Sequence, residues 1–381
     1  MANTNLTPTI ITKKALAILH QKLNFVGTIN RQYDSRFAQS GAKIGDTLTI
    51  RKPNKYTIRT GAVMNTQDVA EPSTTLQVAS QAGVDLNFTM KELTMDIDNF
   101  SEIHLEPAMA TLAAYIESQA YSMYKDVPNI IDGDAAALTL LNILQGGAKL
   151  TDNLTPKDNN RIAMLSTTHT VKLINDTKAL FHDSTAIAKQ YREGVIGRTG
   201  GFDFYENTHV GSHTTGTAAK TTGYTVNGAT QSGATITIQT GTTSFLKGDI
   251  VTFAGCYDVH PETKVTRANL KQFVVTADSG TSATSLAISP SLTVSGAFQN
   301  CSAYPTDTGA VVKVAAGASE TINTSMVYHR DAFAFATADL MVPKGVHFAA
   351  REVYDGVSMR LVQAYDIVND KLPCRVDVLF G

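Results

Sequence analysis

The triplet His329-Arg330-Asp331 has the residue types of a kinase catalytic loop. In that loop the aspartate is the catalytic base, and an asparagine five residues later binds a metal ion. The corresponding position is Ala336, and no glycine-rich nucleotide loop precedes the triplet. The triplet therefore does not predict phosphoryl transfer.

Two histidines and an acidic pair have the residue types of metal ligands. His209 and His213 have the i, i+4 spacing of ligands on one face of a helix, but Gly211 between them argues against a helix. No third ligand lies nearby in the sequence. Asp132-Gly133-Asp134 lacks the rest of a calcium-binding loop, and we interpret it as a turn followed by a helix cap. We predict no metal site and no cofactor.

A serine nucleophile and a dinucleotide loop are also not supported. Ser166 and His169 are close in the sequence, but no nucleophile elbow surrounds the serine. Gly194, Gly197 and Gly200 are spaced three apart, which is not the G-x-G-x-x-G pattern and indicates a turn-rich loop. Without a catalytic constellation, we predict that the chain is not an enzyme.

Composition indicates a folded protein that does not grip nucleic acid. The 381 residues are 43% hydrophobic and only 17% charged, with abundant threonine, serine, alanine and glycine. Such a chain buries a sizeable core. The formal net charge is -2, whereas DNA-binding domains need a concentrated basic face. We expect the chain to lie near nucleic acid without holding it specifically.

The cysteines and the apolar runs concern the compartment. Cys256, Cys301 and Cys374 are far apart and odd in number, so they indicate neither a zinc site nor a disulfide framework. They fit synthesis in a reducing cytoplasm. The N-terminal residues do not have the pattern of a signal peptide, and no apolar run reaches the length of a membrane span.

The N-terminal part of the chain predicts an arm and a long hairpin. Apolar residues at helical spacing predict an amphipathic helix over 10–23. Alternation predicts strands over 47–51 and 84–90, and a polar stretch over 53–80 lies between them. Because long loops without structure of their own are usually functional, we expect a protruding hairpin that another surface receives.

Two helices are predicted next. Pro107 suits a first helical turn, Pro128 ends the segment, and apolar residues repeat every three or four positions between them, which predicts one long helix. A second helix is expected over 134–145, with Asp134 as its N-cap and Gly146-Gly147 as its stop.

The remainder predicts a mixed domain that a β module interrupts. Residues 161–210 indicate mixed helix and strand, whereas 211–325 is rich in threonine, serine and glycine with short alternating runs, typical of a sandwich or barrel. Alternation returns over 357–361 and 374–380. A charged run inside the β module either contacts neighbouring molecules or is a solvated loop: Asp258, Glu262, Lys264, Arg267 and Lys271.

Several segments, taken in order, resemble the coat proteins of short-tailed phages. In those proteins an alternating strand, a KEL turn and an EPAM-like start lead into a long spine helix. The segments are TKKAL at 12–16, VDLNFTM at 84–90, KELTMD at 91–96, IHLEPAM at 103–109, LAAYIE at 112–117 and GGFDFYEN at 200–207.

The resemblance implies an α+β chain with the tailed-phage and herpesvirus capsid fold and an inserted, telokin-like β-barrel. Its parts would be an N-terminal arm, an extended E-loop, a peripheral domain with the spine helix at about 105–127, and an axial domain. The implied bounds are 1–46 for the arm, 47–90 for the E-loop hairpin, 91–221 for the peripheral domain and the first part of the axial domain, 222–323 for the inserted barrel, and 324–381 for the completion of both domains.

The resemblance also implies a function. The chain would be a major capsid protein that self-assembles, as pentamers and hexamers, into the icosahedral head shell around a double-stranded DNA genome. Its partners would be a scaffolding protein, a portal protein and non-specifically contacted DNA, without a membrane, and its place would be the virion after assembly in the host cytoplasm. The alternatives are a cargo-enclosing compartment shell of the same fold and a hydrolase or adhesin with a β appendage.

Overall fold

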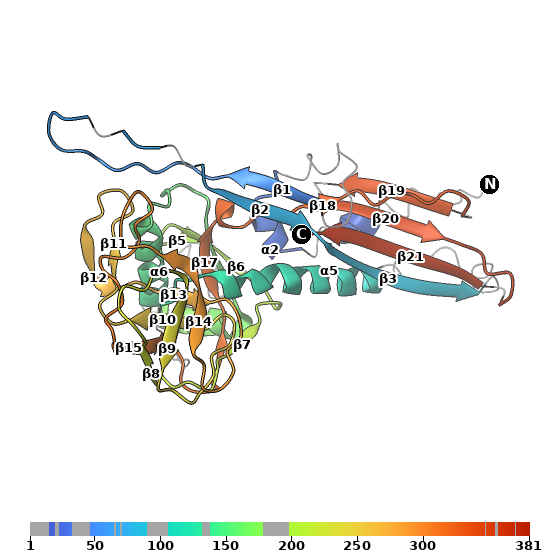
Figure 1. Ribbon diagram of the computed structural model, residues 1–381. Helices are drawn as coiled ribbons and strands as arrows, with labels where there is room; N and C mark the ends of the chain where they lie inside the picture. The colour runs from blue at the N-terminus through green and yellow to red at the C-terminus, as the bar shows by residue number, and fades with distance from the viewer. Residues whose placement is uncertain are drawn as a thin grey trace, which may run out of the picture. The chain divides into compact units, whose positions relative to one another are not determined.

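The computed structural model describes residues 15–19, 23–32, 46–64, 66–68, 71–89, 106–131, 138–177, 198–346, 348–354, 357–369 and 371–381. These residues form two compact units, and the chain passes between the units more than once (Figure 1). The first unit lies within Met1–Pro53, Glu71–Ala120 and Arg330–Gly381. The second lies within Asn54–Ala70 and Tyr121–His329. The first unit is therefore completed only after the chain has made the second.

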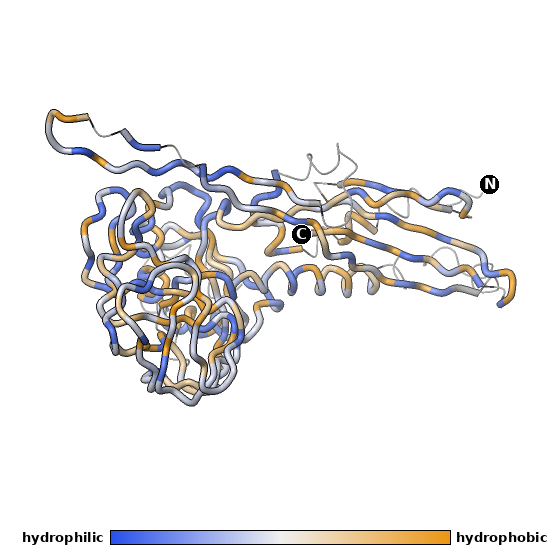
Figure 2. Tube along the Cα trace, viewed as in Figure 1, coloured by the Kyte–Doolittle hydropathy of each residue, from blue (hydrophilic) through white to orange (hydrophobic). Residues whose placement is uncertain are grey.

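A twisted antiparallel sheet is the centre of the first unit. Strand β21 pairs with β3 along its whole length and also with β20 and β18, and β19 lies beside β20. The strands are β3 (Ser80–Thr89), β18 (Thr337–Ala338), β19 (Phe348–Tyr354), β20 (Val357–Gln363) and β21 (Lys371–Phe380). Apolar and polar residues alternate along them (Figure 2). The predicted C-terminal strands are confirmed, with Val357, Met359 and Leu361 on the buried face.

The opposite face of β21 also contains a buried charge. Asp377 is fully buried, and its carboxylate accepts hydrogen bonds from Arg360 at 2.6 Å and Arg375 at 2.9 Å. Gly83 on β3 lies opposite Asp377, where a Cβ atom would be only 2.6 Å from the carboxylate. The glycine thus leaves the space that this ion pair needs.

The predicted hairpin exists, but its second strand was wrong. Strand β1 (Asp46–Arg51) pairs with β2 (Ser73–Val78), whereas the alternating segment at 84–90 belongs to β3 and pairs with β21. Only one residue of β2, Val78, is buried. Because β2 is exposed on both faces for most of its length, it has no apolar alternation to reveal it.

The spine helix begins as predicted but ends earlier. Helix α5 (Glu106–Tyr121) includes Pro107 in its first turn and buries Met109, Leu112 and Ile116 on one face. The chain then tightens into the 3₁₀ helix η2 (Ser122–Asp126). The α-helix cannot continue to Val127, because Pro128 forces the residue before it into an extended conformation.

Glu117 connects the spine helix to the N-terminal arm. Its side chain is fully buried and accepts hydrogen bonds from the backbone N–H groups of Phe25 at 3.0 Å and Val26 at 3.3 Å. These two residues begin the short helix α2 (Phe25–Thr28), whose first N–H groups have no partner within the helix. Residues 15–19 of the predicted amphipathic helix are also helical, and the rest of 10–23 lies partly outside the described residues.

A mixed sheet with two helices begins the second unit. Its strand order is β17-β4-β6-β5, with β4 and β6 parallel. The elements are helices α6 (Leu140–Asp152) and α7 (Thr167–Thr177) and strands β4 (Arg161–Leu165), β5 (Arg198–Thr199), β6 (Phe202–Glu206) and β17 (Met326–His329). Gly200 and Gly201 have φ angles of 63° and 86° and form the predicted turn into β6.

The second predicted helix was placed wrongly. Helix α6 begins after Thr139, which forms a capping box with Asn142, and it runs through Gly146 and Gly147. A Cβ atom on Gly146 would lie 2.6 Å from Val327, and one on Gly147 would lie 3.1 Å from the Phe202 ring. The glycines therefore serve close packing of the helix against the sheet, not its termination. Asp134, the predicted cap, lies outside the described residues.

The predicted β module is a closed six-stranded barrel with the order β10-β13-β14-β9-β8-β15. Aromatic and aliphatic side chains fill it, among them Tyr224, Phe245, Phe253 and Phe273. The barrel strands are β8 (Thr221–Val226), β9 (Gly233–Gln239), β10 (Ile250–Phe253), β13 (Phe273–Val275), β14 (Ser285–Leu292) and β15 (Ala310–Val314). A separate hairpin consists of β11 (Tyr257–Val259) and β12 (Thr266–Leu270).

The two ends of the barrel segment are held together by another strand pair. Strand β7 (Ser212–Thr214) pairs antiparallel with β16 (Thr321–Asn323). The pair therefore closes the segment that contains the barrel. We call this strand pair, together with residues 215–220 and 315–320 that join it to the barrel, the neck.

Candidate functional site

The kinase-like triplet does not form a catalytic centre. His329 hydrogen-bonds through Nε2 to Asp158 at 3.1 Å, and Asp331 accepts a hydrogen bond from the Asn30 amide at 2.8 Å. The backbone N–H of Asn160 and the His329 imidazole hold the pKa of Asp158 down at about 2. The first contact joins a loop to β17 in the second unit, and the second contact lies within the first unit.

The two spaced histidines have separate environments. His209 lies in a turn, where its backbone N–H donates to Asn207, whereas His213 lies in strand β7 and is nearly buried. The Nε2 atom of His213 lies 3.2 Å from an Asp249 carboxylate oxygen. Among the described residues, no group of three or more histidine, cysteine, aspartate or glutamate side chains could hold a metal ion.

Asp249 is one of two buried charges at the neck, and sequence reasoning missed both. Its carboxylate also accepts hydrogen bonds from the backbone N–H groups of Gly216 and Leu246, each at 3.0 Å. The second charge is Lys313, 1% exposed, whose Nζ donates to the carbonyls of Gly216 at 3.2 Å and Gly317 at 2.7 Å. Burial lowers the pKa of Lys313, and Asp249 and Glu320 partly oppose this effect. Together these hydrogen bonds stabilise the backbone of the neck.

Ser166 and His169 are brought together with a third residue that the sequence did not indicate. Ser166 precedes helix α7, and its hydroxyl accepts a hydrogen bond from the His169 N–H at 3.3 Å, as a helix cap does. The Ser325 hydroxyl lies 2.7 Å from Nδ1 of His169 and accepts the Ser166 N–H at 3.1 Å. Burial lowers the pKa of His169. The three residues join the start of α7 to the segment before β17.

Asp132-Gly133-Asp134 and the glycines Gly194 and Gly197 lie outside the described residues, so their interpretation as turns stays a prediction. An open groove of about 340 Å³ lies beside α6, lined by Leu144, Arg161, Phe202 and others. The guanidinium of Arg161 is engaged there by the carbonyls of Pro156 and Thr155. No described helix is long and apolar enough to cross a membrane.

The charged run of the barrel segment is used mainly within the second unit. Arg267 pairs with Asp152 at 3.3 Å, and Lys271 pairs with Asp258 at 2.9 Å. Lys264 donates to backbone carbonyls, including that of Ala297 at 2.8 Å. Four of the five charges thus hold the β11–β12 hairpin in place, which favours neither of the two sequence-based interpretations as a whole.

A further surface lies in the loop between β1 and β2, and we call its described residues, 54–64 and 66–68, the tip loop. Gln67 pairs with both backbone groups of Thr57, accepting from its N–H at 2.9 Å and donating to its carbonyl at 2.6 Å. Arg59 donates to the carbonyls of Gly61 and Val63 across the turn. The loop is therefore organised by its own hydrogen bonds.

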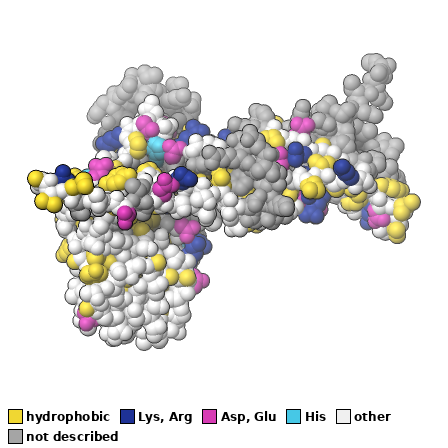
Figure 3. All heavy atoms as spheres, turned by 45° about the horizontal axis from the view of Figure 1, so that its top comes forward, with side chains coloured by type: hydrophobic (Ala, Val, Ile, Leu, Met, Phe, Trp, Pro, Cys, Tyr) yellow, Lys and Arg dark blue, Asp and Glu magenta, His cyan; other side chains and the backbone are white. Residues whose placement is uncertain are grey.

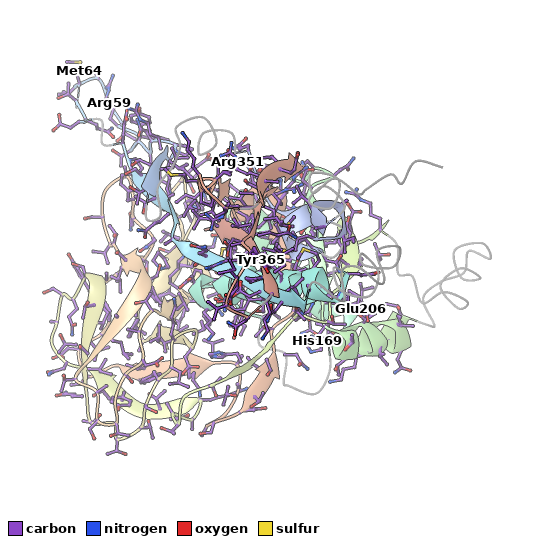
Figure 4. All side chains as sticks on the ribbon, turned by 90° about the vertical axis from the view of Figure 1, so that its right-hand side faces the viewer. Arg59, Met64, His169, Glu206, Arg351 and Tyr365 are labelled. Atoms are coloured by element: carbon purple, nitrogen blue, oxygen red, sulfur yellow. The ribbon has the colours of Figure 1, made fainter. Side chains whose placement is uncertain are left out.

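The tip loop carries four large exposed apolar side chains close together in the sequence. Ile58 is 87% exposed, Val63 85%, Met64 77% and Tyr56 59%. Apolar atoms gather at the end of the hairpin (Figure 3), and the labelled Arg59 and Met64 lie at its outer end (Figure 4). Burying an aliphatic side chain is favourable by roughly 1.5–3 kcal/mol. An organised loop with such a surface is suited to contact with another molecule.

Comparison with known proteins gives a family match over the whole chain. A family model described as "P22 coat protein - gene protein 5" matches residues 1–381. Among curated proteins, no sequence matches the chain.

Solved phage structures resemble the chain weakly. A chain of Mycobacterium phage Che8 has 10% identity and a TM-score of 0.49, covering 94% of this chain and 86% of its own. A chain of the bacteriophage PhiM1 mature capsid has 11% identity and a TM-score of 0.40, covering 89% and 78%. The CUS-3 coat protein I-domain has 26% identity and a TM-score of 0.19, covering 24% of this chain and 94% of its own. With TM-scores below 0.5, these likenesses support no further conclusion.

Proposed function

Because the chain belongs to the P22 coat protein family, whose model it matches throughout, we propose that it encloses double-stranded DNA with the help of scaffolding and portal proteins. The family itself makes the chain a major capsid protein that forms the phage head shell, which confirms the predicted function and the predicted α+β capsid fold. Its place is the virion. Assembly in the host cytoplasm and the absence of any enzymatic role belong to the proposal.

The observation that carries the assembly mechanism is the tip loop. A lone subunit leaves Ile58, Val63 and Met64 in water, and Gln67 and Arg59 make hydrogen bonds within the loop around them. Preorganised apolar groups bind without a large loss of conformational entropy. The loop acts as a clasp that covers its apolar end against a neighbouring copy of the chain.

The remaining parts of the proposal concern domains. We keep the bounds 1–46, 47–90, 91–221, 222–323 and 324–381 as proposals. Within 47–90 the hairpin itself consists of β1 and β2, whereas β3 belongs to the sheet with β21. The inserted barrel at 222–323 stabilises the subunit. The closed strand order and the paired ends of the segment support an insertion that folds as one body. DNA is enclosed without specific contacts, which a net charge of -2 supports.

The clasp is tested by replacing Ile58 and Met64 together with serine in full-length protein, co-expressed with its scaffolding protein. The base of the hairpin packs through Leu48, Leu76 and Val78, which the change does not touch. We expect the free energy of unfolding, obtained from thermal melts, to stay within about 0.5 kcal/mol of the wild-type value. Sedimentation and electron microscopy should show few or no shells.

The matched control is Thr66→Ala, which removes an exposed polar group from the same loop. It should assemble as the wild type does. Normal shells from the double variant would show that the tip loop is not a clasp, without bearing on the family. Failure of the double variant to fold would show that the loop belongs to the core.

A further inference from the structure

Two cysteine side chains lie next to each other in the barrel core. The Sγ atoms of Cys256 and Cys301 lie 2.7 Å apart, and both side chains are fully buried. A disulfide bond is about 2.05 Å long, so a small movement would join the two atoms. The third cysteine, Cys374, lies on β21 of the first unit.

Backbone hydrogen bonds hold both cysteines in place. The N–H of Cys256 donates to Phe253 at 3.2 Å, and the N–H of Cys301 donates to Thr293 at 3.1 Å. Cys301 also forms a β-bridge with Asp258, two residues after Cys256. The two thiols are thus neighbours because of the barrel fold, although 45 positions separate them in the sequence.

We propose that Cys256 and Cys301 are a disulfide site, closed by a low-molecular-weight disulfide oxidant when the folded protein leaves a reducing environment. One thiol loses its proton and attacks the oxidant, which releases one small thiol and leaves a mixed disulfide. The second thiol loses its proton and displaces the other small thiol. In total the protein loses two protons and two electrons, and one oxidant molecule takes them up and becomes two thiols.

Two consequences follow from the position of the site. The hydrogen bond with Cys256 and burial raise the pKa of the Cys301 thiol, so the reaction should be slow and should need local opening of the barrel. Once formed, the bond closes a loop that contains β11 to β14 and restricts the unfolded chain. The oxidised barrel should therefore melt at a higher temperature than the reduced one.

The test uses full-length wild-type protein with glutathione disulfide or with dithiothreitol at mildly alkaline pH. After the small molecules are removed, the protein is unfolded, its free thiols are alkylated and its peptides are mapped. The reduced sample should carry three labels and the oxidised sample one, on Cys374, with the other two cysteines in one linked peptide. A second sample, refolded from urea in a glutathione redox buffer, removes the limit that burial places on access.

Variants identify the pair. Cys374→Ala should still lose two labels on oxidation and should still gain melting temperature, whereas Cys301→Ala should do neither. A link in either wild-type sample supports the site. Full labelling of all three cysteines in both the oxidised and the refolded wild-type sample would overturn the proposal. A link that involves Cys374 would also overturn it.

Discussion

At the scale of single residues, Lys313 is a buried charged group at the neck. Its replacement by alanine removes the ammonium group that satisfies the carbonyls of Gly216 and Gly317 and leaves a cavity. We expect a loss of about 2–4 kcal/mol in the free energy of unfolding, measured by urea titration. Lys247→Ala is the control, because Lys247 forms an exposed ion pair with Asp126 and should cost less than about 1 kcal/mol. Equal effects would contradict a role for burial.

Lys149 allows a pH-dependent prediction. Its Nζ donates to the Ile130 carbonyl at 2.9 Å and to Gln272, and burial lowers its pKa from 10.5 to about 8. Above about pH 8 the folded protein therefore binds fewer protons at this site than the unfolded chain does, until the pH passes 10.5 and the unfolded chain has also lost its proton. Stability relative to Lys149→Met should rise between these pH values.

The measurement is a set of urea titrations of both proteins between pH 7 and pH 10. Comparison with the methionine variant cancels the titration of other groups, and the loss of the two hydrogen bonds adds only a constant difference. A difference in stability that stays level with pH would mean that the Lys149 pKa is not lowered.

At the scale of elements, the two glycines inside α6 show that packing can outweigh helix propensity. Gly146→Ala improves the propensity of the helix by about 1 kcal/mol, but the new methyl group would lie 2.6 Å from Val327. We expect a net destabilisation of about 1–3 kcal/mol in thermal or urea unfolding. The double variant Gly146→Ala with Val327→Ala should recover part of this loss. A stabilising single substitution would mean that α6 does not pack closely on β17.

At the scale of the whole molecule, we expect the neck to determine how stable the barrel is when it is expressed without the rest of the chain. Residues 211–325, expressed alone, should unfold cooperatively with a β-type circular dichroism spectrum, because they include the barrel, β7 and β16. A shorter piece, 220–316, lacks the strand pair that holds the ends together and should melt at a lower temperature. If the piece 211–325 lacked amide dispersion in its NMR spectrum, the barrel would depend on the rest of the chain for folding.

Much of the local structure could be predicted because side-chain periodicity reports which face is buried. The stripe of Met109, Leu112 and Ile116 predicted one face of the spine helix, and the alternation at Val357, Met359 and Leu361 predicted a strand. The order of the quoted segments was enough to indicate the family. These features depend on neighbours in the chain, whose spacing is visible in the sequence.

Which strands pair, and which distant side chains meet, were decided only by the tertiary structure. A pattern shows that a strand is half-buried but not which strand lies beside it, so β1 was matched with 84–90 and not with β2. The inward position of Lys313 follows from its register with Val311, and Gly146 shows its role only against Val327. The pairing of Ser325 with His169 and of Cys256 with Cys301 likewise joins distant segments. Such contacts depend on the sum of many long-range interactions, which no local spacing records.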